Sequence, residues 1–159
     1  MPEFRTSNEA LRKCEINGQI LPALEIDIDK IKALIEFSDG DQEAALKLMQ
    51  GLDEKSILWN NAYIAYYDAL HKLVDAYLRF DKITSLNHLC LFSYLCEKHP
   101  ELELDWNFFE KIRTKRNGVQ YYGQKASKED WTLIQLQMKL YIRVLEKAIE
   151  KKLKEPSGF

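Results

Sequence analysis

Glycine and proline are both scarce in this chain, with 6 glycines and 4 prolines among 159 residues. A low-complexity or collagen-like chain is therefore excluded, and a turn-rich β-sandwich is disfavoured. No run approaches the ~18 consecutive apolar residues that a membrane-spanning helix needs. Residues 1–5 also lack the apolar core of a signal peptide. We therefore expect a soluble, cytoplasmic protein that does not contact a membrane.

Cysteine is sparse as well. Cys14, Cys90 and Cys96 are odd in number and form no Cys-x-x-Cys pair. A secreted disulfide framework would normally show an even and denser set. The sequence therefore predicts reduced, mostly buried thiols.

Charge of one sign is not in excess, because 23 Lys and Arg face 25 Asp and Glu, for a net charge of −2. This balance excludes a strongly basic histone-like binder and an acidic disordered tail. His71, His88 and His99 show none of the paired spacings of zinc ligands, so we expect neither a metal nor a cofactor. The hydrophobic content of 46% can supply one core, and the length fits one domain of about 100–200 residues.

What the chain does have is helical periodicity. Apolar residues recur every three or four positions, which is typical of helices that bury one face. The predicted long helices cover 56–80, 86–98, 105–122 and 128–153. An earlier helical pattern starts near Asp27, and the polar residues 38–41 are expected to separate it from a second helix that ends near Gln50. Short connections favour antiparallel neighbours, so the predicted fold is an all-α, antiparallel up-and-down helical bundle.

The predicted organisation is a single helical domain over 26–154. Before it, residues 1–25 are expected to form an appendage that is flexible or contains a short helix over 8–15. After it, residues 155–159 are expected to form a disordered tail. No internal repeat is present.

Arg116 stands out because it shares an apolar stripe, four residues after Ile112 and three before Val119. A guanidinium on a buried stripe needs a partner, or it faces a groove or a subunit interface. The alternative is an arginine whose stem packs while its head reaches water.

The surroundings of Arg116 favour a binding role. A basic cluster is followed by polar and aromatic residues, in the order Lys111, Arg113, Lys115, Arg116, Asn117, Tyr121 and Tyr122. Basic residues beside aromatic faces are typical of phosphate and base contacts. Dipole compensation at a helix C-terminus is the alternative explanation.

Three segments, in this order, resemble the HEPN domain family. Residues 66–78 resemble its central helix, 85–91 resemble the serine–histidine start of the next helix, and 116–122 resemble its signature arginine segment. The resemblance covers 28–153. It implies an antiparallel four-helix bundle with extra helices that dimerises so that two signatures face one groove. It also implies metal-independent RNA cleavage that leaves a cyclic phosphate. Many relatives are toxins paired with a minimal nucleotidyltransferase, and some bind nucleotides without cutting RNA.

The sequence departs from the HEPN pattern at its signature, where an arginine and a polar residue are followed by a histidine. Arg116 and Asn117 match the first two positions, but Tyr121, or Tyr122 at a longer spacing, occupies the third. An ordinary tyrosine has a pKa of about 10, against about 6.5 for histidine, and is a poorer general base near neutrality. It can still donate a hydrogen bond, stack on a base or accept an adenylyl group.

Two histidines elsewhere could replace the missing one. His71 lies on an apolar row and is interpreted as a satisfied core histidine, and His88 lies just inside a helix start, where it is expected to bond locally. His99 precedes Pro100 and is expected to be exposed.

The candidate binding residues are Arg116, Asn117, Lys115, Tyr121 and Tyr122, and the candidate catalytic ones are Arg116 and Tyr121. The leading hypothesis is a HEPN-like homodimer that binds nucleotide or RNA phosphate, or a nucleotidyltransferase partner, and is not an efficient nuclease. The alternatives are a metal-independent, toxin-like endoribonuclease in which tyrosine replaces histidine, and a protein-interaction scaffold without a ligand.

Overall fold

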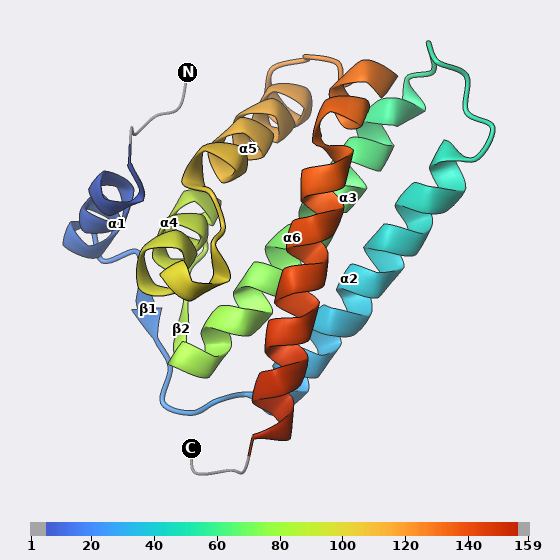
Figure 1. Ribbon diagram of the computed structural model, residues 1–159. Helices are drawn as coiled ribbons and strands as arrows, with labels where there is room; N and C mark the ends of the chain where they lie inside the picture. Colours follow the sequence, from blue (N-terminus) through green and yellow to red (C-terminus); the bar gives the residue numbers. More distant parts are fainter. Residues whose placement is uncertain (1–5, 156–159) are drawn as a thin grey trace.

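Helices make up most of the chain in this computed structural model, which describes residues 6–155 (Figure 1). The α-helices are α1 (Ser7–Ile16), α2 (Ile28–Met49), α3 (Leu58–Leu78), α4 (His88–Lys98), α5 (Trp106–Tyr121) and α6 (Lys128–Lys154). Two short 3-10 helices, η1 (Arg79–Asp81) and η2 (Pro100–Leu102), and two short strands, β1 (Leu21–Pro22) and β2 (Ile83–Thr84), complete the described part. The expectations for residues 1–5 and 156–159 lie outside it. The all-α bundle is confirmed.

α3 is the central helix, because it packs against α2, α4, α5 and α6. In Figure 1, α2 and α6 lie along α3 on one side of the molecule, and α4 and α5 lie on the other. The row of α3 residues that the three–four spacing predicts as the core is buried: Trp59, Tyr63, Tyr66, Leu70, Leu73 and Tyr77. Periodicity alone therefore located the face of α3 that the bundle covers.

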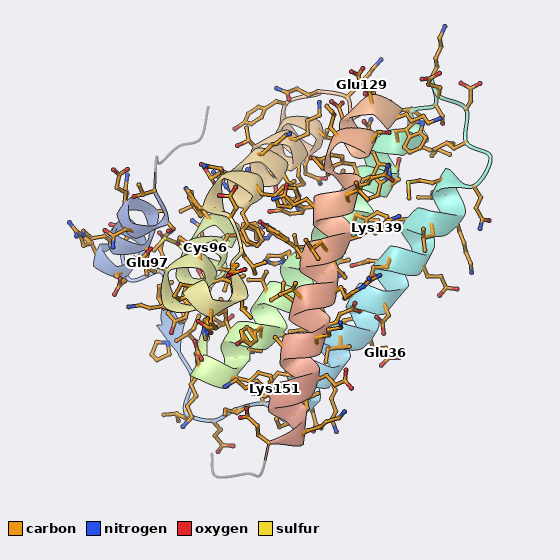
Figure 2. All side chains as sticks on the ribbon, in the orientation of Figure 1. Glu36, Cys96, Glu97, Glu129, Lys139 and Lys151 are labelled. Atoms are coloured by element: carbon orange, nitrogen blue, oxygen red, sulfur yellow. A yellow bond between two sulfur atoms is a disulfide. The ribbon has the colours of Figure 1, made fainter. Side chains whose placement is uncertain are left out.

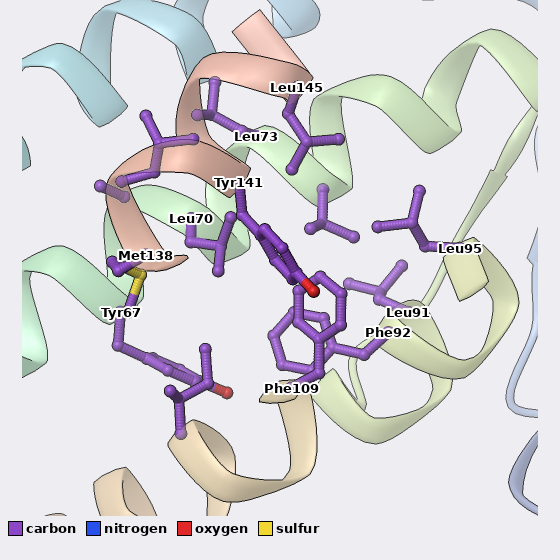
Figure 3. Packing of buried hydrophobic residues seen from close by; sticks show 14 of the residues in the cluster. Tyr67, Leu70, Leu73, Leu91, Phe92, Leu95, Phe109, Met138, Tyr141 and Leu145 are labelled. Atoms are coloured by element: carbon purple, nitrogen blue, oxygen red, sulfur yellow. The ribbon is translucent and has the colours of Figure 1, made fainter. Parts of the chain in front are cut away.

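Aromatic rings join α4, α5 and α6 into this core. Phe92 stacks on Phe109 with ring centroids 4.7 Å apart, and Phe108 meets Tyr141 edge to face at 4.8 Å. Figure 3 shows Phe92, Phe109 and Tyr141 together in the buried cluster, with Tyr67 at its side. Offset and edge-to-face ring pairs add stability beyond the area that they bury.

Helix ends follow the expected chemistry. Asp105 caps α5 by accepting a hydrogen bond from Asn107 N. Ser127 and Asp130 form a capping box at the start of α6. After α5, Gly123 adopts a φ of 69°, a left-handed conformation that glycine adopts without strain. This turn brings Gln124 N back onto the carbonyl of Gly118.

The predicted break at 38–41 is wrong, because α2 continues through it. Ser38 is buried, and its hydroxyl donates to the carbonyl of Ala69 on α3 at 2.9 Å. Asp41 pairs with Lys72 of α3. These polar residues therefore anchor α2 to α3, and tertiary bonds override their local preference for a helix end.

The prediction of reduced thiols is also wrong for two of the three cysteines. Cys14 of α1 and Cys90 of α4 form a disulfide between positions 76 residues apart in sequence. Cys96 is a free thiol, and burial raises its pKa to about 12. Spacing along the chain carries no signal for a pair that tertiary packing brings together.

A helix does form within residues 1–25, and α1 packs onto α4. Ala10, Leu11 and Cys14 are its buried face. Glu97 of α4, labelled in Figure 2, accepts hydrogen bonds from Ser7 Oγ at 2.9 Å and Asn8 Nδ2 at 3.2 Å. The disulfide fastens the end of α1 to the start of α4, and the contacts to Glu97 fasten the start of α1 to the end of α4.

Candidate functional site

A pocket of about 590 Å³ opens where α5 faces the start of α4 and the segment between α1 and β1. Its lining residues are Gly18, Gln19, Leu21, Ser85, Leu86, Asn87, His88, Leu89, Arg113, Arg116, Asn117 and Tyr121. The α5 residues come from the segment that the sequence singled out. The α4 residues come from the serine–histidine segment, so the fold joins two of the three segments that resemble the HEPN family.

Arg116 lies between two aromatic rings. Its guanidinium carbon is 5.4 Å from the ring centroid of Tyr67 and 5.6 Å from that of Tyr121. Its Nη1 donates to Asn117 Oδ1 at 3.3 Å and to the Tyr121 hydroxyl at 3.4 Å. Cation–π contacts with the two rings hold the guanidinium in place without neutralising its charge.

Arg116 also keeps unused bonding capacity. Its Nε is buried and has no hydrogen-bond partner in residues 6–155, and the guanidinium makes no ion pair there. A buried unsatisfied donor costs about 1–3 kcal/mol. Such groups are rare in folded proteins, so Arg116 stands apart from an ordinary buried arginine.

Arg113 lies one turn earlier on α5 and is neutralised locally. Its Nε and Nη2 donate to the two carboxylate oxygens of Glu110 at 2.7 and 3.2 Å. Glu110 is only 2% exposed. Because this fork is shared with a buried acid, Arg116 is the cation of the pocket that offers a net charge to a ligand.

The remaining candidates divide between the pocket and its surroundings. Asn117 and the exposed Tyr121 line the pocket, whereas Lys115 and Tyr122 do not. Lys115 Nζ donates to the carbonyl of Lys125 at 2.8 Å and pairs with Asp130 at 3.2 Å, so it ties α5 to α6. Tyr122 caps the C-terminus of α5 and is 77% exposed.

His88 is the pocket residue whose contacts the sequence did not foresee. Its Nδ1 lies 2.8 Å from the hydroxyl of Tyr67, which is on α3 and not a local neighbour. Its ring stacks on that of His71 at 3.7 Å between centroids. The serine–histidine start of α4 was the one signal that could have placed His88 in the site.

His71 of α3 stacks its ring on that of His88 and is not a satisfied core histidine. Its Nε2 is buried without a hydrogen-bond partner in the described chain. Burial, together with Arg116 and Lys72, lowers its pKa to about 4. The ring is therefore neutral near pH 7.

The first turn of α4 and the residues before it form one wall of the pocket. Asn87 caps it by accepting from Leu89 N at 2.9 Å, and its own N–H donates to Ser85 Oγ at 3.1 Å. The positive end of the helix dipole favours an anion near such a terminus. Together with Arg116, this turn makes the pocket locally cationic in a chain of net charge −2.

Arg116 also affects the pKa of one carboxyl group near the pocket, that of Asp68 on α3. Burial raises the pKa of Asp68 above its ordinary value, while Arg116 and Lys72 act against that rise.

Within residues 6–155, no cluster of three or more His, Cys, Asp or Glu side chains is arranged to hold a metal ion. None of the helices in the same range is long and apolar enough to cross a bilayer.

The fold and the site therefore define an all-α bundle with a cationic, aromatic-lined pocket. No protein-family model, curated protein or solved structure matches the chain. The HEPN resemblance accordingly rests on the residues of this sequence.

Proposed function

We propose that this chain is a HEPN-like module that binds the phosphate of a nucleotide or of RNA in the pocket around Arg116. The observation that carries the proposal is the state of Arg116. Its guanidinium contacts the rings of Tyr67 and Tyr121 and has no acidic partner among the described residues. A guanidinium fork can bind a phosphate with two parallel hydrogen bonds.

The rim of the pocket suits the rest of a nucleotide. Leu86 is 95% exposed and Tyr121 is 65% exposed, and both line the pocket. An aromatic ring next to a phosphate-binding arginine gives a base a surface on which to stack. Asn117 adds an amide beside the same guanidinium.

The test is the affinity for AMP and for a short fluorescein-labelled single-stranded RNA, measured by calorimetry and fluorescence anisotropy. Arg116→Ala is expected to weaken binding about ten- to a hundredfold, since one charge-assisted contact is lost. Arg143→Ala is the matched control, because Arg143 is exposed on α6 and lies outside the pocket. Affinity should also fall about tenfold between about 50 and 200 mM salt if about two phosphates are contacted.

The same experiment separates the alternatives. RNA cleavage that persists in chelator and disappears in Arg116→Ala would favour the endoribonuclease, with Tyr121 beside Arg116 as its second residue. Equal binding by the wild type and folded Arg116→Ala would remove the phosphate site and favour a protein-interaction scaffold.

The HEPN resemblance extends the proposal to the partners of the protein and to its location in the cell. We infer a homodimer with α5 near the interface, a minimal nucleotidyltransferase as the partner protein in a toxin–antitoxin pair, and a cytoplasmic location. Light scattering and co-purification test the first two. The Cys14–Cys90 disulfide is more typical of an oxidising compartment, so the redox state of these thiols in cells tests the third.

A further inference from the structure

The hydrogen bond between Tyr67 and His88 can have only one direction. Tyr67 is fully buried, and its hydroxyl has no other hydrogen-bond partner in the described chain. If His88 Nδ1 carried a proton and donated it, the phenol proton would be left buried and unpaired, at the full cost of desolvation. Tyr67 therefore donates, and Nδ1 of His88 accepts.

This direction fixes the tautomer of His88. A neutral imidazole carries one proton, and the hydrogen bond at one nitrogen decides where that proton sits. With Nδ1 accepting, the proton is on Nε2. His88 lines the pocket with Arg116, so Nε2–H is the ring group left for a ligand.

We propose that His88, oriented by Tyr67, is a neutral Nε2–H donor to the ligand phosphate, beside Arg116. The inference rests on the proposed function and adds a binding residue that lies 28 positions from Arg116 and on another helix. It makes Tyr67 a positioning residue. It also excludes His88 as a base through Nε2, because a nitrogen that carries the proton has no lone pair with which to accept another.

The surroundings keep His88 neutral. α3 contributes Tyr67, the stacked neutral His71 and Asp75, and α5 contributes the cations Arg113 and Arg116. Burial, His71, Arg116 and Arg113 lower the pKa of His88 to about 3, and Asp75 opposes them weakly.

A neutral donor fits next to Arg116 without charge repulsion. Arg116 and His88 themselves present N–H groups only, from the guanidinium and from the imidazole. The matching ligand is one that offers acceptors only, such as the non-bridging oxygens of a phosphodiester.

The first test compares substitutions of His88 that place an amide group at the position of one imidazole nitrogen or of the other. Glutamine can place its amide N–H near the position of imidazole Nε2, whereas asparagine reaches only the position of Nδ1. His88→Gln is therefore expected to bind the labelled RNA within about threefold of the wild type, and His88→Asn and His88→Ala to bind about tenfold more weakly. His99→Gln, on the far end of α4 and outside the pocket, is the matched control.

The second test reads the tautomer without any ligand. In ¹⁵N-labelled wild type, the histidine spectrum should show His88 protonated at Nε2 alone between about pH 5.5 and 8. Tyr67→Phe should lose this fixed tautomer, because nothing then donates to Nδ1. RNA affinity of the wild type should change less than about twofold over the same pH range, since neither a phosphodiester nor His88 titrates there.

The outcomes separate the inference from the function on which it rests. Equal binding by the wild type and Arg116→Ala overturns the phosphate site itself. Loss of binding in Arg116→Ala, together with unchanged binding in His88→Ala, overturns the role of His88 alone. A proton on Nδ1, or affinity that rises about tenfold as pH falls through about 6.5, also overturns it.

Discussion

The two ends of α4 each carry a histidine, in opposite surroundings. His88 begins the helix among a stacked histidine and two arginines, and its pKa is lowered to about 3. His99 caps the other end, where Nε2 lies 2.6 Å from Asp81 and Nδ1 lies 2.9 Å from Glu101. The hydrogen bond to Asp81 is the main cause that raises the pKa of His99, with Glu101 adding to it and burial opposing it.

At both ends of α4, the helix dipole shifts the histidine pKa in the same direction as the neighbouring side chains do. The start of a helix carries a partial positive charge that disfavours a cation, and its end carries a negative one that favours it. The comparison shows that surroundings decide the role of each ring. Neutral His88 is left as a donor beside Arg116, whereas His99 is held in an ion-paired bridge to η1 and η2.

The largest expected effect on stability comes from removing the disulfide that links α1 to the start of α4. The Cys14–Cys90 disulfide closes a loop of 76 residues, and loop-closure entropy of that length is worth about 4.5 kcal/mol. Cys14→Ser combined with Cys90→Ser is expected to lower the free energy of unfolding by about this amount in urea. Cys96→Ser, which touches the free thiol on the same helix, serves as the control.

The double variant should also weaken RNA binding, because Gly18 and Gln19, which follow α1, line the pocket. An unchanged urea midpoint after removal of both sulfurs would show that α1 is held by packing and by Glu97 alone.

The next largest effect is a loss of stability at low pH, which arises from His71 beside the start of α4. His71 has a pKa of about 4 in the folded chain and about 6.5 when unfolded. Below pH 6.5 or so the unfolded chain binds a proton that the folded chain refuses, so stability falls as pH drops towards 4. The loss that His71 contributes is about 3 kcal/mol.

His71→Leu removes this titration and the unsatisfied Nε2 with it. The variant and the wild type are compared by urea unfolding at about pH 7 and about pH 4.5. We expect the variant to lose less stability on acidification. Parallel losses in the two proteins would mean that His71 titrates normally.

Much of the fold could be predicted because its signals are local. The helices α3, α5 and α6 follow from apolar spacing within each segment, and Asp105 and Ser127 mark helix starts by their own side chains. Ser38 misled the prediction because its hydroxyl bonds the carbonyl of Ala69, 31 residues away. No local pattern distinguishes that bond from a cap.

The candidate site could be predicted only on its α5 side. Arg116, Asn117 and Tyr121 are near one another in sequence, so their clustering was visible before the fold. His88 reaches the pocket from α4, and Tyr67 of α3 bonds to it from the core; only the packing of those helices brings the two together. His99 was expected to be exposed, and its bridge to Asp81 depends on η1 in the same way.

The smallest expected effect is at the far end of α4 and has the opposite sign. His99 has a raised pKa in the folded chain, so its ion pairs stabilise the protein below about pH 6.5 and are lost as pH rises through the folded pKa. Glu101 is 60% exposed, and Asp81 is 26% exposed. Solvent screening therefore limits the bridge to about 0.5–1 kcal/mol.

His99→Gln should be less stable than the wild type by about this amount near pH 6, with the gap closing towards pH 8 or so. The measurement is urea unfolding at both values, with Asp81→Asn as the matched variant that removes the carboxylate instead. If the stability gap stays the same at both pH values, His99 carries no charge in this bridge. The contrast between the two ends of α4 would then lie in packing and not in protonation.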